Sequence, residues 1–402
     1  MKNRFLFAIA AAIFALGSMP NLVWGDTAPA ALSNKIVASV QPFVDNHTLA
    51  GAVLLVASKD KVLSVDTVGY ADIEAKKLMS PDSLFWIASM SKSMTATALM
   101  MLVDEGKVKV DDPVEKYLPE YDGQMVVAEQ DADHMVLQKP VHPILVRNVL
   151  SHTSGLPFLS RVIHHIDQFP LSESVITYAM SPLLFQPGSK YKYANAGLDT
   201  AGRIVEVVSG MPYEQFMATR LFEPLGMKDT TFFPSEEQVA RLAKSYKPNA
   251  DKTDLVETEI TQLSYPLTGK DRHPSPSGGL FSTAGDCGTF CRMILAGGVF
   301  DGKRYISEAS IRQMTSTQTG DLVVKAKSEK AYGFGWQTEH KMPEGADTVR
   351  TGGFGHGGAY STNMYVDLDH QLVFIYMVQD AGKNGGRIHD TFKEAAIDAF
   401  AK

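Results

Sequence analysis

Features that would point to many common functions are scarce or missing in this 402-residue chain. It has two cysteines, Cys287 and Cys291, in a segment with helical periodicity, where a disulfide along one helix face has poor geometry; we expect two buried free thiols. No basic run occurs and the net charge is −7, so binding to nucleic acid has no electrostatic support. No Gly-x-Ser-x-Gly stretch is present, which excludes the nucleophile elbow of an α/β-hydrolase.

Long hydrophobic runs are also missing. The unbroken apolar run Phe5–Leu16 is shorter than the about 20 residues that a membrane span needs. It follows Lys2 and Arg4 and precedes small residues, so residues 1–25 are predicted to be a secretory signal peptide, with an uncleaved anchor as the alternative. We therefore expect a periplasmic or secreted protein without stable membrane insertion after cleavage.

Strands are predicted at both ends of the chain, each end also carrying an amphipathic helix. Period-two and β-rich patterns favour two hairpins, and period-3.6 patterns favour the two helices. These segments are residues 50–58 with 61–72, residues 360–368 with 371–380, and the helices 32–44 and 387–400. The predicted fold class is α+β or α/β: an antiparallel sheet (26–88 and 270–402) flanked by N- and C-terminal helices, with an inserted, mostly α-helical lobe (89–269).

The stretch WIASMSKSMTATALMMLVDEG places a serine and a lysine at the start of a long apolar helix. Ser-x-x-Lys occurs three times, at Ser58, Ser89 and Ser189, but only Ser89 lies where a loop enters such a helix. Residues three apart share a helix face, so Lys92 can reach the Ser89 hydroxyl. Burial and the helix N-terminus would lower the lysine pKa, so that a neutral amine could take the serine proton. The alternative is a helix-capping serine beside a solvated lysine.

Two later motifs carry residues suited to the same chemistry. Tyr193 and Asn195 stand between a Pro-Gly turn and an amphipathic helix. A tyrosine relays protons if a nearby cation such as Lys92 depresses its pKa, and an asparagine can hold a substrate amide. A tyrosine and an asparagine that merely cap a loop are the alternative.

The glycine-rich stretch TGGFGHGGAYSTNMYVDL begins a C-terminal strand. His356 could bind a substrate carboxylate or assist proton transfer. Gly358 allows close approach of a ligand to the backbone, and the N–H of Ala359 could donate to an oxyanion. The alternative is a glycine-rich turn with an incidental histidine.

The remaining histidines do not form a metal motif. His152 and the His164–His165 pair have a spacing that fits no standard site, so we expect structural or surface positions for them.

The three motifs in this order resemble those of the serine β-lactamases and penicillin-recognising hydrolases, and the Tyr-x-Asn form resembles the class C branch with its esterase and D-peptidase relatives. Further matching phrases are LSHTSGLP (150–157), LFEPLGMKDTTF (221–232), SGGLFSTAGDCGTF (277–290) and YGFGW (332–336). The likeness spans nearly the whole chain after residue 25.

The resemblance implies a role for each motif residue. Ser89 would be the nucleophile of an acyl-enzyme, Lys92 its base or the tuner of that base, and Tyr193 the partner base that also protonates the leaving group. Substrate would be bound by Asn195, His356, Gly358 and Ala359, the last sharing the oxyanion hole with the Ser89 N–H. No metal or organic cofactor is implied.

One departure affects the expected substrate. His356 stands where class C β-lactamases usually have lysine, and it is a weaker anchor for a penicillin carboxylate. We therefore expect a peptidase or amidase on a small or unusual linear peptide; one relative opens linearised microcystin, a cyanobacterial toxin peptide. The alternatives are a carboxylesterase on short acyl esters, a class C-like β-lactamase and a non-catalytic penicillin-binding-like protein. Loops 121–145, 158–172 and 315–330 are expected to shape the pocket.

Overall fold

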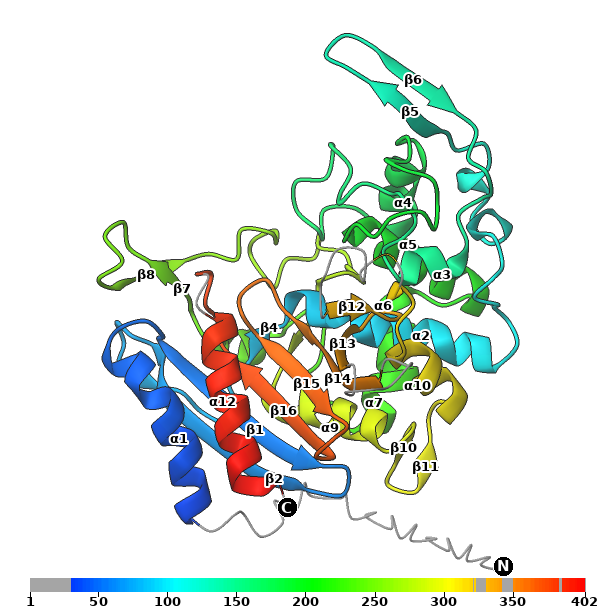
Figure 1. Cartoon of the computed structure of the whole chain (residues 1–402). Coiled ribbons are helices and arrows are strands. Elements are labelled where there is room, and N and C mark those ends of the chain that lie inside the picture. The colour runs from blue at the N-terminus through cyan, green and yellow to red at the C-terminus, as the bar shows by residue number, and fades with distance from the viewer. Residues whose placement is uncertain (1–29, 321, 323–329, 342–349, 383–384, 402) are drawn as a thin grey trace, which may run out of the picture.

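A computed structural model describes residues 30–320, 322, 330–341, 350–382 and 385–401 (Figure 1). The predicted signal peptide and part of the loop 315–330 lie outside the described residues. Within the described part, none of the helices combines the length and the apolar character that crossing a bilayer requires.

One antiparallel sheet joins the two ends of the chain. Its strand order is β12-β13-β14-β15-β16-β1-β2-β3, and the pairing of Val53 with Met377 lies where the N-terminal strands meet the C-terminal ones. Both predicted hairpins are confirmed, as β1–β2 and β15–β16. The strands are β1 (Gly51–Ser58), β2 (Val62–Asp72), β3 (Lys77–Leu78), β12 (Lys330–Tyr332), β13 (Gln337–Lys341), β14 (Arg350–Gly357), β15 (Asn363–Asp367) and β16 (Leu372–Met377).

The central strand β1 is buried on both faces, which explains its unbroken apolar sequence. Val53 and Leu55 belong to the main core, whereas Leu54 and Val56 belong to a second core on the opposite face. Successive side chains of a strand point to opposite faces, so a strand covered on both sides needs apolar residues at every position.

Helices α1 (Ala30–Asp45) and α12 (Gly385–Phe400) cover the outer face of the sheet, as predicted, and pack side by side (Figure 1). The opposite face is covered by α9 (Ala284–Leu295), which packs on β1 and β16. Cys287 and Cys291 lie buried in α9 as free thiols, as predicted.

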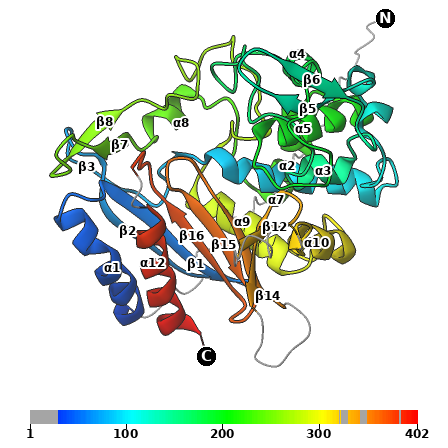
Figure 2. The same cartoon turned by 45° about the horizontal axis from the view of Figure 1, so that its top comes forward.

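The inserted segment is largely helical. Figures 1 and 2 show α2 between the sheet and the helices α3, α4 and α5 of the insertion. Its helices are α2 (Ser91–Asp104), α3 (Val146–Leu150), α4 (Leu171–Ala179), α5 (Asn195–Ser209), α6 (Tyr213–Met217), α7 (Glu223–Leu225) and α8 (Glu236–Ala240), with short turns η1 (Ala88–Met90), η2 (Val114–Lys116), η3 (Pro119–Tyr121) and η4 (Ala218–Phe222). Helix α10 (Glu308–Thr315) follows α9 and contacts α2.

Two hairpins in this segment were not predicted. The expected loop 121–145 contains β5 (Val126–Gln130) and β6 (Met135–Gln138), and a second hairpin joins β7 (Ser245–Pro248) to β8 (Leu255–Thr258). Strand β6 is exposed along its whole length, so it has no buried face that would impose the period-two pattern. The remaining short strands are β4 (Phe85–Trp86), which pairs with β9 (Phe281–Ser282), and β10 (Val299–Phe300), which pairs with β11 (Lys303–Arg304).

A buried ion pair joins an irregular part of the insertion to the chain that follows it. The guanidinium of Arg272 donates from Nε to Asp167 Oδ2 at 2.7 Å, and the two side chains are 3% and 0% exposed. Asp167 also accepts from the N–H and the hydroxyl of Ser264. Every lone pair that burial strips of water thus finds a donor, which is the condition under which such a pair is tolerated.

Replacing Asp167 with alanine is expected to lower the free energy of unfolding by about 3–5 kcal/mol, because the Arg272 charge stays buried without its partner. Denaturant unfolding of the full chain measures the change. The matched control is Glu308→Gln, which breaks the exposed pair with Arg312 (64% and 67% exposed) and should cost at most about 0.5 kcal/mol. Equal effects of the two variants would contradict the importance of the buried pair.

Candidate active site

The chain around Ser89 is fixed by backbone pairing before it enters α2. Strand β4 pairs with β9, and the Ile87 N–H donates to the Leu280 carbonyl at 2.9 Å. Ala88 then adopts a left-handed φ of 46°, although it is buried and not glycine. Such strain costs on the order of 1–3 kcal/mol and persists only where surrounding contacts enforce it. The turn η1 therefore presents Ser89 at a defined position.

The three serines of this stretch have different surroundings. Ser91 is fully buried, donates to the Ala88 carbonyl at 2.6 Å and accepts from the Leu280 N–H at 3.2 Å. Ser93 is also fully buried and donates to the Gly335 carbonyl at 2.7 Å. Ser89 alone keeps part of its surface open to solvent. Two serines thus pin the helix start, and the third is accessible.

Lys92 lies fully buried, one helical turn from Ser89. Its Nζ is 3.0 Å from Ser89 Oγ, 2.8 Å from Asn195 Oδ1 and 2.5 Å from the Ser277 carbonyl oxygen. Burial lowers the pKa of Lys92 to about 7, and the charge of Asp199 opposes that shift. A neutral amine has two N–H groups and one lone pair. Because a carbonyl oxygen can only accept, the two N–H groups belong to Asn195 and Ser277, and the lone pair faces the Ser89 hydroxyl.

Asp199 acts on Lys92 through its charge and through a hydrogen bond to Ser277, which contacts the lysine. Its Oδ1 accepts from the Ser277 N–H at 3.0 Å, and its Oδ2 accepts from the Tyr178 hydroxyl at 2.9 Å. Burial raises the pKa of the Asp199 carboxyl. The backbone of Ser277 therefore connects the carboxyl to the amine, with its N–H on Asp199 and its carbonyl on Lys92.

Tyr193 and Asn195 lie beside Ser89 and Lys92, as the motif order predicts. Lys92 Nζ is 4.9 Å from the centre of the Tyr193 ring, and the Ser89 side chain lies close enough to the Tyr193 hydroxyl to oppose the rise of its pKa. The expected depression of the tyrosine pKa is wrong, since burial raises the pKa of Tyr193 well above its usual value. Tyr193 is a neutral phenol in the resting site. Desolvation of a phenolate outweighs the nearby amine, which is itself buried.

His356 lies on β14 with both ring nitrogens engaged. Nδ1 is 2.8 Å from the Gly357 carbonyl oxygen, which can only accept, so Nδ1 carries the proton. Nε2 therefore accepts from the Tyr332 hydroxyl at 2.9 Å. Burial and the charge of Lys92 lower the pKa of His356 to about 3. The ring is neutral and 2% exposed, so it does not present the cation that a bound carboxylate would need.

Gly358 brings the end of β14 against the residue that precedes η1. A Cβ on Gly358 would lie 2.7 Å from the Ile87 carbonyl oxygen, closer than real Cβ atoms approach. The Gly358 N–H donates to the Thr362 carbonyl at 2.7 Å. Ala359 follows with an exposed surface, and no acceptor for its N–H is found within the described residues.

Four residues of this site were not predicted. His152 was expected in a structural or surface position, and it is buried; what the sequence did not indicate is that its ring centre lies 4.4 Å from those of Tyr193 and Tyr332. Tyr332 and Ser277 stand in the phrases YGFGW and SGGLFSTAGDCGTF, which gave the only signal in the sequence for either. Asp199 lies one helical turn after Asn195 on the same face of α5, and that spacing could have indicated it.

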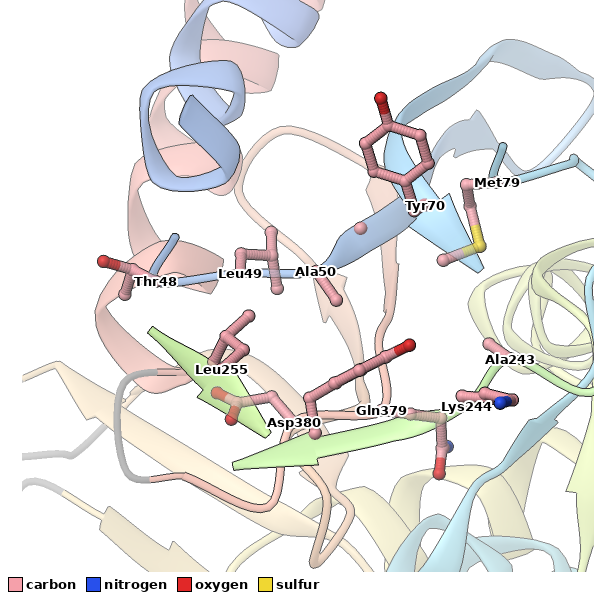
Figure 3. Close-up of a pocket in the computed structure, with 12 residues that line it drawn as sticks. Thr48, Leu49, Ala50, Tyr70, Met79, Ala243, Lys244, Leu255, Gln379 and Asp380 are labelled. Atoms are coloured by element: carbon pink, nitrogen blue, oxygen red, sulfur yellow. The ribbon is translucent and has the colours of Figure 1, made fainter. Parts of the chain in front are cut away.

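The cavity drawn in Figure 3 lies away from this cluster. It is lined by residues that include Tyr70, Lys244 and Asp380, and its volume of about 10 Å³ is room for about one water molecule. Asp380 Oδ2 is buried there and has no hydrogen-bond partner among the described residues. The cavity is too small for a substrate. Elsewhere in the described part of the chain, no cluster of His, Cys, Asp or Glu is arranged to hold a metal ion.

Comparisons with known proteins identify the family and the fold. The profile of the Beta-lactamase family matches residues 36–399. Protein Rv1367c of Mycobacterium tuberculosis is 32% identical over 361 residues, covering 85% of this chain and 88% of the relative.

Two further relatives match shorter parts. Esterase EstB of Burkholderia gladioli is 30% identical over 223 residues (52% of this chain, 54% of the relative). The D-alanyl-D-alanine-carboxypeptidase/endopeptidase AmpH of Escherichia coli K12 is 35% identical over 165 residues (40% of each chain).

The fold is shared with the solved structure of EstCE1, a hydrolase with promiscuous acyltransferase activity. The TM-score is 0.78 at 23% identity, covering 91% of this chain and 98% of that one. The family profile, the relative that matches along most of the chain and the shared fold together make this chain a member of the β-lactamase family, a family of serine hydrolases.

Proposed function

We propose that the protein is a peptidase or amidase that cleaves a small or unusual linear peptide through an acyl-enzyme on Ser89. Neutral Lys92 takes the proton of the Ser89 hydroxyl as Oγ attacks the substrate carbonyl. The N–H groups of Ser89 and Ala359 receive the developing oxyanion, and Asn195 orients the substrate amide. Tyr193 gives its phenolic proton to the leaving amine as the C–N bond breaks.

Water completes the cycle. The Tyr193 phenolate, stabilised by the Lys92 ammonium beside it, takes a proton from water as the hydroxide attacks the acyl carbon. Oγ of Ser89 leaves and recovers its proton from Lys92. Both bases then hold the protons with which they began, and the products are a carboxylic acid and an amine.

The state of Tyr193 is the observation that carries the amide assignment. An amine leaves only when it is protonated, whereas an alkoxide from an activated ester leaves without help. Burial raises the pKa of Tyr193, and the Ser89 side chain lies next to its hydroxyl, so a proton donor stands beside the reacting atom before substrate arrives. A binding protein has no need of this donor, nor of a lysine with a pKa of about 7.

The state of His356 argues against a β-lactamase. A penicillin presents a carboxylate to the third motif, and lysine there would meet it with a full charge. His356 is neutral, with one nitrogen on Gly357 and the other on Tyr332. Peptides without a carboxylate next to the scissile bond do not need that charge.

A carboxylesterase on short acyl esters is the second candidate, favoured by the likeness to EstB. The same nucleophile and base would serve. Turnover rates on a substrate panel decide which activity dominates. The panel contains p-nitrophenyl esters, a penicillin and linear peptides that include D-residues and linearised microcystin. Faster turnover of every ester than of any peptide would overturn the first proposal in favour of the second.

We also infer export from the cytoplasm, which rests on the charge and apolar pattern of residues 1–25. The mass of the protein recovered from the periplasm or medium tests it, since cleavage near Asp26 is expected. A full-length protein held in the membrane would support the anchor instead.

Ser89→Ala and Lys92→Ala are each expected to lower kcat/KM by more than about a hundredfold without unfolding the chain, because an activated nucleophile and its base act as a unit. Matched controls are Ser58→Ala and Lys61→Ala, the same Ser-x-x-Lys pattern in the β1–β2 turn, which should keep wild-type rates. A fluorophosphonate probe mapped by mass spectrometry should label Ser89. Undiminished activity of Ser89→Ala would exclude the mechanism.

Tyr193→Phe separates the two candidate reactions. Loss of the phenolic proton is expected to lower amide turnover by about 10²–10⁴-fold, in the range of general acid catalysis, and turnover of a p-nitrophenyl ester much less. The ratio of the two kcat values in wild-type and variant enzyme measures this. An equal loss for both substrates would remove the argument for an amide substrate.

The pH dependence should report Lys92. Its amine acts only when neutral, so kcat/KM is expected to be low in acid and to rise through a midpoint near pH 7. His356, with its pKa lowered to about 3, and His152, with its pKa also lowered, stay neutral across this range and do not contribute. Because the Asp199 charge raises the pKa of Lys92, Asp199→Asn should move the midpoint to lower pH. A midpoint that moves up instead would contradict this assignment.

A further inference from the structure

His152 occupies an unusual position in the turn after α3. It is 1% exposed and has a left-handed φ of 58°, which only a few per cent of non-glycine residues adopt, asparagine, aspartate and histidine more often than the others. A buried histidine in a strained backbone is kept only where its contacts require it. Its hydrogen bonds lead to the segment that carries Tyr193.

The acceptors of His152 hold the residues on both sides of Tyr193. Its carbonyl oxygen accepts from the Lys192 N–H at 2.9 Å, and its Nδ1 accepts from the Ala194 N–H at 3.1 Å. Residues 190–194 belong to no helix or strand, so no ladder of backbone hydrogen bonds holds them. Side-chain packing also constrains the phenol.

The ring of His152 supplies that packing too. It lies 4.4 Å from the ring centre of Tyr193 at a tilt of 38°, and 4.4 Å from that of Tyr332 at 65°. The phenol of Tyr193 is therefore placed by a backbone bond before it, a backbone bond after it and a ring against its face, all from one residue.

The hydrogen bonds also determine the protonation state of His152. A backbone N–H can only donate, so Nδ1 must be unprotonated and Nε2 carries the hydrogen. Burial and the neighbouring Lys92 and His356 lower the pKa of His152, which keeps Nδ1 available as an acceptor. A protonated His152 would turn Nδ1 into a donor facing the Ala194 N–H.

We propose that His152 is a positioning residue for Tyr193: by accepting hydrogen bonds from Lys192 and Ala194, it holds the phenol at the Ser89 hydroxyl. The inference rests on the proposed function of Tyr193 as the proton donor to the leaving group. His152 itself touches no reacting atom. A displacement of about 1 Å at a reacting group can cost about a hundredfold in rate, which is the scale of effect available to such a residue.

Three substitutions of His152 distinguish the effect of its side-chain acceptor from the effect of its strained backbone. Asparagine tolerates positive φ and carries a carbonyl oxygen near the place of Nδ1. Leucine has nearly the same shape as asparagine but no side-chain acceptor for the Ala194 N–H, and glycine tolerates the backbone but also has no side-chain acceptor; the main-chain carbonyl that accepts from Lys192 remains in every variant. We expect His152→Leu and His152→Gly to lose about 10- to 100-fold in kcat for an amide substrate, and His152→Asn to recover most of that loss.

A double-mutant cycle tests whether the effect passes through Tyr193. In the Tyr193→Phe background, which lacks the phenolic hydroxyl, His152→Leu should cost less than about twofold, because there is no hydroxyl left to misplace. Labelling of Ser89 by a fluorophosphonate needs no leaving amine, so its rate should change little with His152→Leu. Thermal unfolding of each variant checks that the chain is folded.

Each outcome bears on a different claim. A large loss in Tyr193→Phe with little loss in a folded His152→Leu would overturn this inference and leave the proposed function standing. Full additivity in the cycle, or equal losses for Asn, Leu and Gly, would also overturn it, since the acceptor would then have no effect through the phenol. No loss in Tyr193→Phe itself would instead remove the proposed function on which the inference rests.

Discussion

The amine of Lys92 lies where water does not reach it, and the rest of the site is arranged around that fact. An isolated buried ammonium would cost several kcal/mol, so the group either loses its proton or finds acceptors for every N–H. Both solutions are present in one place. Three oxygens surround Nζ, and burial lowers the pKa to about 7, so that neither protonation state is strongly disfavoured near neutral pH.

Backbone and side-chain groups from distant parts of the chain meet at this amine. Ser277 contributes its carbonyl 185 residues along the sequence from Lys92, and Asn195 contributes its side chain 103 residues along. The Ile87 N–H on Leu280 and the close approach of Gly358 to Ile87 connect the same region to the sheet. The first motif spans η1 and the start of α2, α5 begins at the second, and the third lies at the end of β14 in the sheet.

Most titratable side chains of the site are held in their neutral form, and Lys92 differs from them. Burial favours the neutral form of Tyr193, His356 and His152 alike, and it also raises the pKa of Asp199. Lys92 is the group whose pKa comes to lie near 7. Two groups with pKa values pushed apart by their surroundings, a lysine near neutrality and a tyrosine held protonated, are what a base and an acid in one reaction need.

The sequence by itself determined the two hairpins at the ends, the terminal helices over the sheet, the free thiols and the proximity of Ser89 to Lys92. Each follows from local periodicity or from a spacing of one helical turn. The order of the three motifs indicated the family. The β5–β6 hairpin was not predicted, because β6 is exposed on both faces and therefore lacks the alternation of apolar and polar residues that indicates a strand. Only the tertiary structure decided that His152, Asp199, Ser277 and Tyr332 join the site, and that Tyr193 and His356 are neutral. Burial and hydrogen-bond partners depend on residues far apart in the chain, and those are what set a pKa.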